Sequence, residues 1–576
     1  MSGALAEAVA ADSVGATTVE DAPPVEGRSA RWTSFGAWGL AAYLGSVAAL
    51  VAAVLVYLHG TFVYVLDDPA IHLSVAENLV RDGTWGVEGG AFQSASSSPL
   101  WTLLLAGAAA VTPGNDHWLP LLLNVVAGVG VVLLIGRNQV AIAGRRWSDR
   151  AAVAFVVVVL LFLPGLALVG MEHTLHILLV LGAVLAVQQR ADQPLGRAWV
   201  VPWGLLALAS LARFETAFVA AGLALGLVVQ AAAARRNLRA AVVKGAAISV
   251  AALVPVALFG LVNHALGGGY LPNSILAKGQ GLGASSRAGN GSGPIDMAQR
   301  LTADPVVAGL VVVAVAYLIL TWGRPAPQRL LAVTVVGATV LHAAFADMGW
   351  YERYQAYLIA VGVLMLLGVL AELPAGVQRR CLAALVVGSC LLAPNKINAL
   401  VKVPMAADDM YRGQYQVARF LERYYEGQAI GTDQLGYISL FHDGPITDYA
   451  GLGDYEALQR YPDDSEDAEQ MQRYLADLAR ERGIEVVALP SWGIDADKPP
   501  GWISVGFFES SGNEVTRVSD VFVLWATTPE AVRPLQEHLR EFGRDLPPRM
   551  TLTLNEWATW KADAELQATG KGSAGS

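Results

Sequence analysis

Two adjacent carboxylates, Asp67 and Asp68, follow a long uncharged segment and precede Pro69. Residues 34–58 carry no charge and are long enough to span a bilayer, so the pair is expected at the membrane surface. Ionisable groups at such a position are candidates for a functional site. One carboxylate would be enough to cap the helix that starts near Pro69. Two favour a general base that takes a proton from a hydroxyl, with the neighbour tuning its pKa by like-charge repulsion.

Two further pairs of polar residues interrupt the apolar sequence. Glu172 and His173 begin a segment that lacks the His-Glu-x-x-His order of zinc proteases, so a metal site is not expected there. A hydrogen-bonded helix end, an anion contact and an orienting role all stay open for them. Arg213 and Glu215 are two residues apart, and side chains at that spacing do not face each other on a helix. This spacing weakens the alternative of a structural ion pair between them and leaves each free to contact something else.

Aromatic and amide groups lie close to charged ones at two other places. Tyr351, Glu352 and Arg353 fit an aromatic belt at the membrane interface and a sugar-binding platform equally well. Asn273 and Lys278 open a long loop. The lysine either extends to the membrane surface or holds a lipid phosphate as a point charge.

The composition indicates what positions these residues. The chain has 576 residues, of which 54% are hydrophobic and 15% charged, and its mean hydropathy is +0.45. Soluble domains average about 25% charged residues, so the deficit predicts a polytopic α-helical membrane protein. About eleven transmembrane helices are expected, near residues 34–58, 118–136, 151–169, 174–189, 199–212, 216–233, 245–265, 305–322, 329–346, 355–371 and 381–394.

The basic residues predict the sidedness of the chain. They gather in alternate connections, at residues 28–31, 137–150, 190–197, 235–244, 324–329 and 379–380. The positive-inside rule places these connections in the cytoplasm. The carboxylate pair and the other polar candidates are then expected on the extracytoplasmic side of the plasma membrane. Residues 1–30 lack apolar periodicity and are expected to be a disordered cytoplasmic segment.

The acidic residues are concentrated near the C-terminus. Residues 401–576 contain 16 Lys and Arg against 29 Asp and Glu, whereas the rest of the chain balances to +3. This shift predicts a transmembrane catalytic module at 31–395, an extracytoplasmic α/β domain at 396–560 and a flexible tail at 561–576. Helices are expected at 414–425 and 466–482, and strands at 429–440, 485–489 and 521–525. No basic face is present, so nucleic acid is not an expected partner.

Taken together, these motifs resemble the GT-C glycosyltransferases, and among them the mycobacterial terminal arabinofuranosyltransferases and their bacterial relatives. The resemblance runs from about residue 35 to 525. It is carried by Asp67-Asp68, Ser97-Ser98-Pro99-Leu100-Trp101, Gly170-Met171-Glu172, Arg213-Phe214-Glu215, Leu271-Pro272-Asn273-Ser274-Ile275-Leu276-Ala277-Lys278, Asp433-Gln434-Leu435-Gly436-Tyr437 and Thr447-Asp448-Tyr449-Ala450-Gly451-Leu452.

This resemblance implies a sugar transfer, with arabinofuranose as the expected sugar. The partners would be a polyprenyl-phosphate sugar donor, a glycan acceptor of the cell envelope and membrane lipid. Asp67 would be the base that deprotonates the acceptor hydroxyl, and Asp68 would orient it or the acceptor. Attack opposite the lipid phosphate inverts the anomeric centre. The phosphate diester leaves without protonation, so one carboxylate suffices, unlike in glycosidases.

The departing phosphate needs stabilising groups. The candidates are His72, His173, Arg213, Lys278 and Arg353. The substrate-binding set is completed by Glu172, Glu215, Asn273, Tyr351 and Glu352. Some members of the superfamily use a divalent cation, and this sequence leaves that requirement open.

Three alternatives compete with this hypothesis. The same superfamily contains mannosyl-type hexosyltransferases. A transporter or flippase would also have many apolar helices, but transporters often show matching halves and interrupted helices near the membrane midplane. The polar motifs here lie on one expected face instead. A non-catalytic scaffold whose outer domain binds glycan is the third, and an assay of sugar transfer from polyprenyl phosphate separates it from an enzyme.

Overall fold

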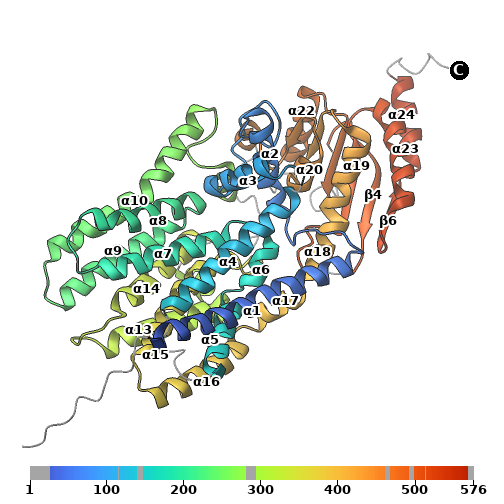
Figure 1. Cartoon of the computed structure of the whole chain (residues 1–576). Coiled ribbons are helices and arrows are strands. Elements are labelled where there is room, and N and C mark those ends of the chain that lie inside the picture. The colour runs from blue at the N-terminus through green and yellow to red at the C-terminus, as the bar shows by residue number, and fades with distance from the viewer. Residues whose placement is uncertain are drawn as a thin grey trace, which may run out of the picture.

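The computed structural model describes residues 26–114, 116–138, 147–279, 294–460, 468–491, 499–512 and 514–568. Figure 1 shows two parts, a body of long helices and a sheet flanked by helices at one end of that body. The first helices are α1 (Glu26–Tyr57), α2 (Asp68–Asp82), α3 (Pro99–Val111), α4 (Leu119–Asn138), α5 (Trp147–Leu160), α6 (Leu163–Val169), α7 (His173–Arg190), α8 (Val200–Ala212), α9 (Thr216–Ala233) and α10 (Leu238–Ala265).

The helices continue to the edge of the sheet. They are α11 (Asn273–Gly279), α12 (Pro294–Ala303), α13 (Pro305–Leu320), α14 (Arg329–Phe345), α15 (Ala356–Ala371), α16 (Ala375–Leu392), α17 (Pro394–Val401), α18 (Val403–Met410) and α19 (Gln416–Tyr425). Each uncharged run of the sequence coincides with one or two of these helices. The expected helical class with several apolar helices is therefore confirmed.

Not all of these helices reach across a bilayer by themselves. In the described part of the chain, five are long and apolar enough, and two bent pairs raise the number to seven. These five are Ala37–Tyr57, Asp116–Arg137, Ala151–Val169, Thr216–Ala233 and Leu238–Ala265. The expected total was about eleven; the other expected spans correspond to α7 and to the shorter helices α8, α14 and α15. At 1.5 Å per residue, the 13 residues of α8 extend about 20 Å, less than a hydrocarbon core of about 30 Å.

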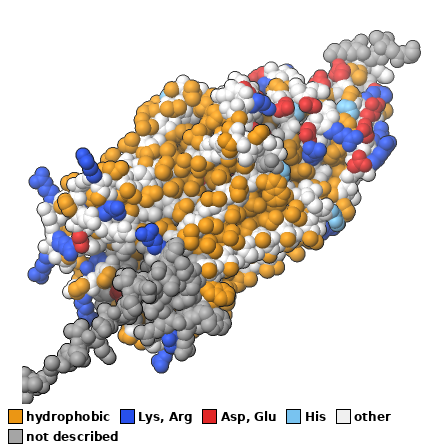
Figure 2. All heavy atoms as spheres, in the orientation of Figure 1, with side chains coloured by type: hydrophobic (Ala, Val, Ile, Leu, Met, Phe, Trp, Pro, Cys, Tyr) orange, Lys and Arg blue, Asp and Glu red, His pale blue; other side chains and the backbone are white. Residues whose placement is uncertain are grey.

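The outer surface of the helical body is apolar over a wide area (Figure 2). The large exposed hydrophobic residues include Val56 of α1, Val126 of α4, Leu225 of α9, Leu258 of α10 and Ile319 of α13. A contiguous apolar surface of this extent marks contact with lipid or with another protein. Since the same helices have membrane-spanning length, the protein is an integral membrane protein.

The sheet has six strands in the order β2-β1-β3-β5-β4-β6. The strands are β1 (Ile430–Thr432), β2 (Ile446–Asp448), β3 (Val486–Pro490), β4 (Ile503–Ser510), β5 (Val521–Ala526) and β6 (Met550–Leu554). Strand β1 pairs in parallel with β2 and β3, and the remaining pairs are antiparallel. The helices of this part are α20 (Gly436–Phe441), α21 (Tyr455–Arg460), α22 (Ala468–Glu481), α23 (Val532–Phe542) and α24 (Trp557–Ala568).

Both faces of this sheet are covered. Successive side chains of a strand point to opposite faces, and Val486 of β3 belongs to the main core whereas Val487 belongs to a second cluster. Phe420 of α19 packs edge-on against Phe508 of β4 on the main-core side. Leu478 of α22 lies in the second cluster on the other side. The described helices α19 and α22 thus bury opposite faces.

The expected strand at residues 429–440 is wrong beyond its first residues. Strand β1 ends at Thr432, and Gly436 begins α20. The apolar sequence there suits either structure, and a contact from far away in the chain decides it. The backbone N–H groups of Gly436 and Tyr437 both donate to the Asp67 carboxylate, which satisfies two donors that a helix start leaves without partners.

The contact between α9 and α14 generates a prediction about stability. A Cβ atom at Gly222 of α9 would lie 2.9 Å from the carbonyl oxygen of Thr334 in α14, so only glycine permits this approach. Gly222→Leu is expected to lower stability by about 1–3 kcal/mol through overpacking. Gly204→Leu in α8 is the control, because its Cβ meets nothing within 4 Å. Thermal unfolding of the detergent-solubilised protein measures both; equal midpoints would contradict the close packing.

Candidate active site

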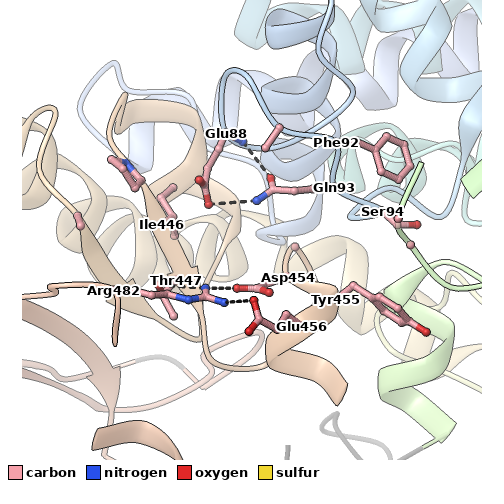
Figure 3. A pocket seen from close by; sticks show the side chains of 16 residues that line it. Glu88, Phe92, Gln93, Ser94, Ile446, Thr447, Asp454, Tyr455, Glu456 and Arg482 are labelled. Carbon is pink, nitrogen blue, oxygen red and sulfur yellow. Dashed lines mark hydrogen bonds and ion pairs between the residues drawn. The ribbon is translucent and has the colours of Figure 1, made fainter. Parts of the chain in front are cut away.

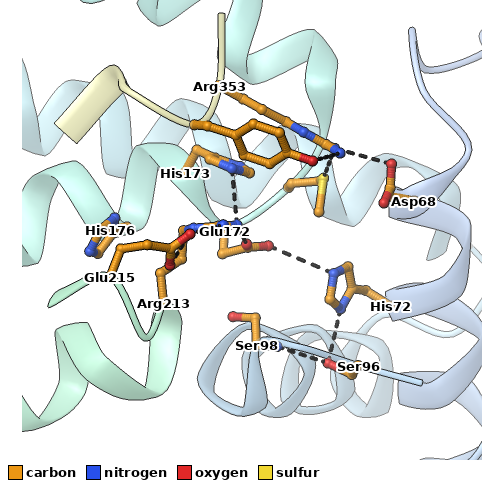
Figure 4. A network of polar contacts seen from close by, with 12 residues as sticks. Asp68, His72, Ser96, Ser98, Glu172, His173, His176, Arg213, Glu215 and Arg353 are labelled. Carbon is orange, nitrogen blue, oxygen red and sulfur yellow. Dashed lines mark hydrogen bonds and ion pairs between the residues drawn. The ribbon is translucent and has the colours of Figure 1, made fainter. Parts of the chain in front are cut away.

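The centre of the candidate site is an ion-pair cluster around Arg213. Its guanidinium contacts Glu172 Oε1 at 2.6 Å and also pairs with both carboxylate oxygens of Glu215. The side chain of Glu172 is fully buried, and that of Arg213 is 11% exposed. Figure 4 shows the arginine between the two carboxylates. Burial of three charges is stable only when they are paired in this way.

The spacing argument against an ion pair between Arg213 and Glu215 is wrong. It assumed a continuous helix, whereas α8 ends at Ala212 and α9 starts at Thr216. Arg213 has extended backbone angles, φ −154° and ψ 134°. The break between the two helices lets the side chains at i and i+2 turn toward each other.

Two histidines extend this cluster on either side. His173 Nε2 lies 3.1 Å from Arg213 Nη1. His72 of α2 lies 3.7 Å from Glu172 Oε2 through its Nε2, and its Nδ1 hydrogen-bonds to Ser96 Oγ at 3.1 Å. Ser96 precedes α3 in the loop that follows α2. The resemblance motif around Ser97 and Pro99 therefore supports a histidine of the site.

The second ion pair joins Asp68 and Arg353. Arg353 Nη1 donates to Asp68 Oδ2 at 3.1 Å, and its Nη2 donates to the Tyr354 hydroxyl at 3.2 Å. The arginine side chain is 5% exposed, but the aspartate is 39% exposed. Figure 4 shows the two side chains pointing toward each other beside the Arg213 cluster. The polar network is defined here as Asp68, His72, Glu172, His173, Arg213, Glu215 and Arg353.

A left-handed turn precedes Arg353. Gly349, Trp350, Tyr351 and Glu352 all have positive φ angles, at 92°, 42°, 57° and 64°. Residues with a side chain rarely adopt this conformation, and each costs about 1–3 kcal/mol. The side chains of consecutive residues in such a turn point in different directions. The turn therefore separates the side chain of Arg353 from those of Tyr351 and Glu352, which were predicted to lie with it.

Asp67 has different surroundings from Asp68. Its carboxylate does not cap its own helix α2; it accepts from the N–H groups of Gly436 and Tyr437 at 2.8 and 2.9 Å. Burial raises the pKa of Asp67 to about 6, outweighing the two N–H donors, and the negative charge of Asp68 adds to the rise. The Ser74 hydroxyl, which donates to the Ser439 carbonyl at 2.9 Å, joins α2 and α20 a second time.

Besides Asp67, four predicted residues lie outside the polar network. The Tyr351 hydroxyl donates to the Ala399 carbonyl at 3.0 Å. Glu352 pairs with Lys396. Asn273 is fully buried beside the loop after α2, since its N–H donates to the Ser94 carbonyl at 3.3 Å. Lys278 belongs to α11, and its side chain lies outside the described residues.

Sequence reasoning missed two participants. Lys396, with 2% side-chain exposure, holds both Glu352 and Asp304 in a separate buried cluster; a lone lysine at the end of an apolar run was its only signal. Gly436, the partner of Asp67, lay in a motif noted for the resemblance. Across the described chain, no group of three or more His, Cys, Asp or Glu side chains could hold a metal ion. A cation site is thus not preformed by these side chains.

The Arg213 cluster generates a second prediction. Arg213→Met would leave Glu172 and Glu215 without their cation, and breaking a buried pair costs about 3–5 kcal/mol. Arg236→Met is the matched control, because Arg236 pairs with Asp192 at an exposed position where an ion pair contributes about 0–1 kcal/mol. Thermal unfolding is expected to separate the two variants clearly. Similar unfolding midpoints for both variants would show that the Arg213 cluster does not contribute to the stability of the fold.

Comparisons with known proteins yield a partial family match and a weak structural likeness. Residues 406–528 match a family described as a domain of unknown function, DUF8728. No curated protein matches the chain. The apo and undecaprenyl-phosphate-bound crystal structures of ArnT from Cupriavidus metallidurans are similar at 13% identity, with TM-scores of 0.45 and 0.44. Each alignment covers 85% of this chain and 98% of the other.

Proposed function

We propose that the protein is an inverting membrane glycosyltransferase that transfers a sugar from a polyprenyl-phosphate donor to a glycan of the cell envelope. One observation carries the proposal. Arg213 is held by Glu172 and Glu215, and the buried Arg353 pairs with the accessible Asp68, at the end of a set of apolar helices. Charges in such surroundings are expensive and mark function. The sequence motifs favour arabinofuranose as the sugar, and a hexose such as mannose is the alternative.

The site and the sheet lie on the extracytoplasmic side in this proposal. At the end of the helical body opposite the sheet, nearly all the charged side chains in view are Lys and Arg, whereas the sheet end carries Asp and Glu together with Lys and Arg (Figure 2). By the positive-inside rule, the basic end faces the cytoplasm. A lipid-linked donor would then bring its sugar to the polar network from the outer leaflet.

The two adjacent aspartates have different tasks. Both oxygens of Asp67 are engaged by the start of α20, which makes Asp67 a positioning residue. Asp68 is 39% exposed and faces the polar network. We therefore assign the base to Asp68, in place of the sequence-based assignment to Asp67. Asp68 would take the proton of the acceptor hydroxyl while the oxygen of that hydroxyl attacks the anomeric carbon.

The arginines supply the charge that a departing phosphate needs. Arg353 Nε has no hydrogen-bond acceptor among the described residues, so a phosphate oxygen can be its partner. Binding of phosphate there would also weaken the hold of Arg353 on Asp68 and make that carboxylate a better base. Arg213 and His173 are the next candidates to stabilise the phosphate charge, and Glu172 fixes the orientation of Arg213. Preorganised cations of this kind stabilise charge that develops in the transition state.

The division between the aspartates can be tested by two substitutions. Asp68→Asn is expected to lower kcat by about 10²- to 10⁴-fold, the usual contribution of a general base, and also to lower the unfolding midpoint, because the buried Arg353 loses its charged partner. Asp67→Asn is expected to lower the midpoint while turnover is retained, because one of the two carboxylate oxygens becomes an NH2 group that faces a backbone N–H donor. The assay uses purified protein, polyprenyl-phosphate arabinofuranose or mannose, and a neutral oligosaccharide acceptor.

Each outcome of this comparison has a definite meaning. Loss of turnover in Asp67→Asn at a normal midpoint, with an active Asp68→Asn, would return the base to Asp67. Near-normal turnover in both variants would remove the carboxylate pair from the mechanism. Transfer from the mannose donor alone would replace arabinofuranose by a hexose.

Arg353 gives an independent prediction about the donor. Arg353→Met is expected to raise the apparent KM for the donor and to lower kcat, because both the bound and the departing phosphate lose a cation. The matched control is Arg329→Met. Arg329 is equally buried, at 3% exposure, but its guanidinium donates to the carbonyls of Thr321 and Arg324. Equal donor KM values in the two variants would contradict a phosphate contact at Arg353.

A further inference from the structure

A cavity of about 540 Å³ opens between the sheet part and the loop that joins α2 to α3. Figure 3 shows its walls. One wall is the loop segment with Glu88, Phe92 and Gln93. The opposite wall is formed by strand β2 and the residues after it in the sequence, including Asp454 and Tyr455. No residue of the polar network lines this cavity, so it is a separate space.

Aromatic and hydrogen-bonding groups are combined on these walls. Phe92 and Tyr455 are both partly exposed and lie toward the same end of the cavity in Figure 3. The amide of Gln93 donates to Glu88 Oε1 at 3.1 Å. This fixes the carboxylate in place while leaving lone pairs for a ligand. Ligand pockets typically join an apolar or aromatic platform to a few oriented polar groups in this manner.

A buried hydroxyl supplies a second observation. Ser94 lines the cavity and is 2% exposed. Its Oγ has no hydrogen-bond partner within the described part of the chain. A buried hydroxyl without a partner costs free energy, and a ligand hydroxyl in the cavity would satisfy it.

The charges of the cavity select the class of ligand. Glu88, Asp454 and Glu456 contribute three carboxylates, and Arg482 is the one guanidinium on the described walls. That guanidinium already pairs with Asp454 and, at 3.4 Å, with Glu456. An anionic ligand would meet net negative charge, whereas the hydroxyl groups of a neutral sugar donate well to carboxylates. The flat apolar faces of sugar rings match the aromatic side chains.

Two segments of the chain lie at the cavity wall and also contact His72 or Asp67. Ser94 is two residues from Ser96, which hydrogen-bonds to His72. On the other wall, a Cβ at Gly453 would lie 2.9 Å from Leu435, the residue before Gly436. The same loop and the same turn thus serve both the cavity and the aspartate pair.

We propose that this cavity binds a neutral oligosaccharide and holds the acceptor glycan whose end reaches Asp68. The proposal rests on the proposed transferase function for the word acceptor, but binding itself does not depend on catalysis. The cavity determines which glycan is used, and the polar network performs the transfer.

Binding is tested without donor, on the purified full-length protein, by isothermal titration calorimetry. The probes are a neutral arabinofuranosyl hexasaccharide and an anionic galacturonate hexasaccharide. The wild type is expected to bind the neutral probe at least tenfold more tightly than the anionic one. Phe92→Ala with Tyr455→Ala should weaken neutral binding at least tenfold. Trp560→Ala, which removes an aromatic side chain 74% exposed on α24, is the control and should bind normally.

Further variants keep the test decisive. Phe92→Leu with Tyr455→Leu preserves apolar volume and serves if the alanine variant unfolds; it should lose the same affinity. Glu88→Gln with Glu456→Gln should reduce the discrimination against the anionic probe. Absence of neutral binding by the wild type, unchanged binding by both aromatic variants, or equal binding of the two probes would each overturn the proposal.

Kinetics separate this proposal from the proposed function. If sugar transfer occurs, the aromatic variants should raise the acceptor KM at least tenfold and leave the donor KM unchanged. Transfer with an unaltered acceptor KM refutes the cavity alone. Binding without any transfer refutes the transferase and keeps the glycan site.

Discussion

The structure depends on one carboxylate that joins two distant parts of the chain. Asp67 follows membrane helix α1, and its oxygens accept the first two N–H groups of α20, some 370 residues later. Hydrogen bonds to a charged acceptor contribute about 1.5–3 kcal/mol each. A side chain at position 436 would overlap Asp67, so glycine is required there. This contact fixes the sheet part against the mouth of the helical body.

The same contact also positions the next residue in the chain, Asp68. Because Asp68 directly follows Asp67, the docking of α20 also sets where Asp68 stands relative to Arg353. The remaining charges of the polar network are held by opposite charges, not by water, since Glu172 is fully buried and Arg213 nearly so. A buried ion pair adds little net stability compared with apolar packing. Its value lies in holding charged groups in a fixed geometry, which suits a site that must stabilise a phosphate.

The local pattern of the sequence was sufficient to predict the helices but not the contacts between them. Uncharged runs marked the helices of the eleven expected spans, because a segment surrounded by lipid or by other apolar helices needs no charged side chain. The segment after Thr432 was misassigned as strand because its helix depends on Asp67. The pair of Arg213 and Glu215 was disfavoured because it needs a break between α8 and α9, and no Gly or Pro marks that break in the sequence. Of the twelve candidate residues, the seven of the polar network meet through long-range packing that residue spacing alone does not encode.

The left-handed turn at residues 349–352 has a consequence for how this chain can be improved or degraded. Glycine at positions 350–352 would relieve backbone strain, because glycine adopts positive φ angles readily. It would also remove the side chains of Tyr351 and Glu352, which anchor the turn to Ala399 and Lys396. The turn that precedes Arg353 would then hold this residue less firmly. The turn is thus a place where relief of backbone strain and accurate positioning of Arg353 oppose each other.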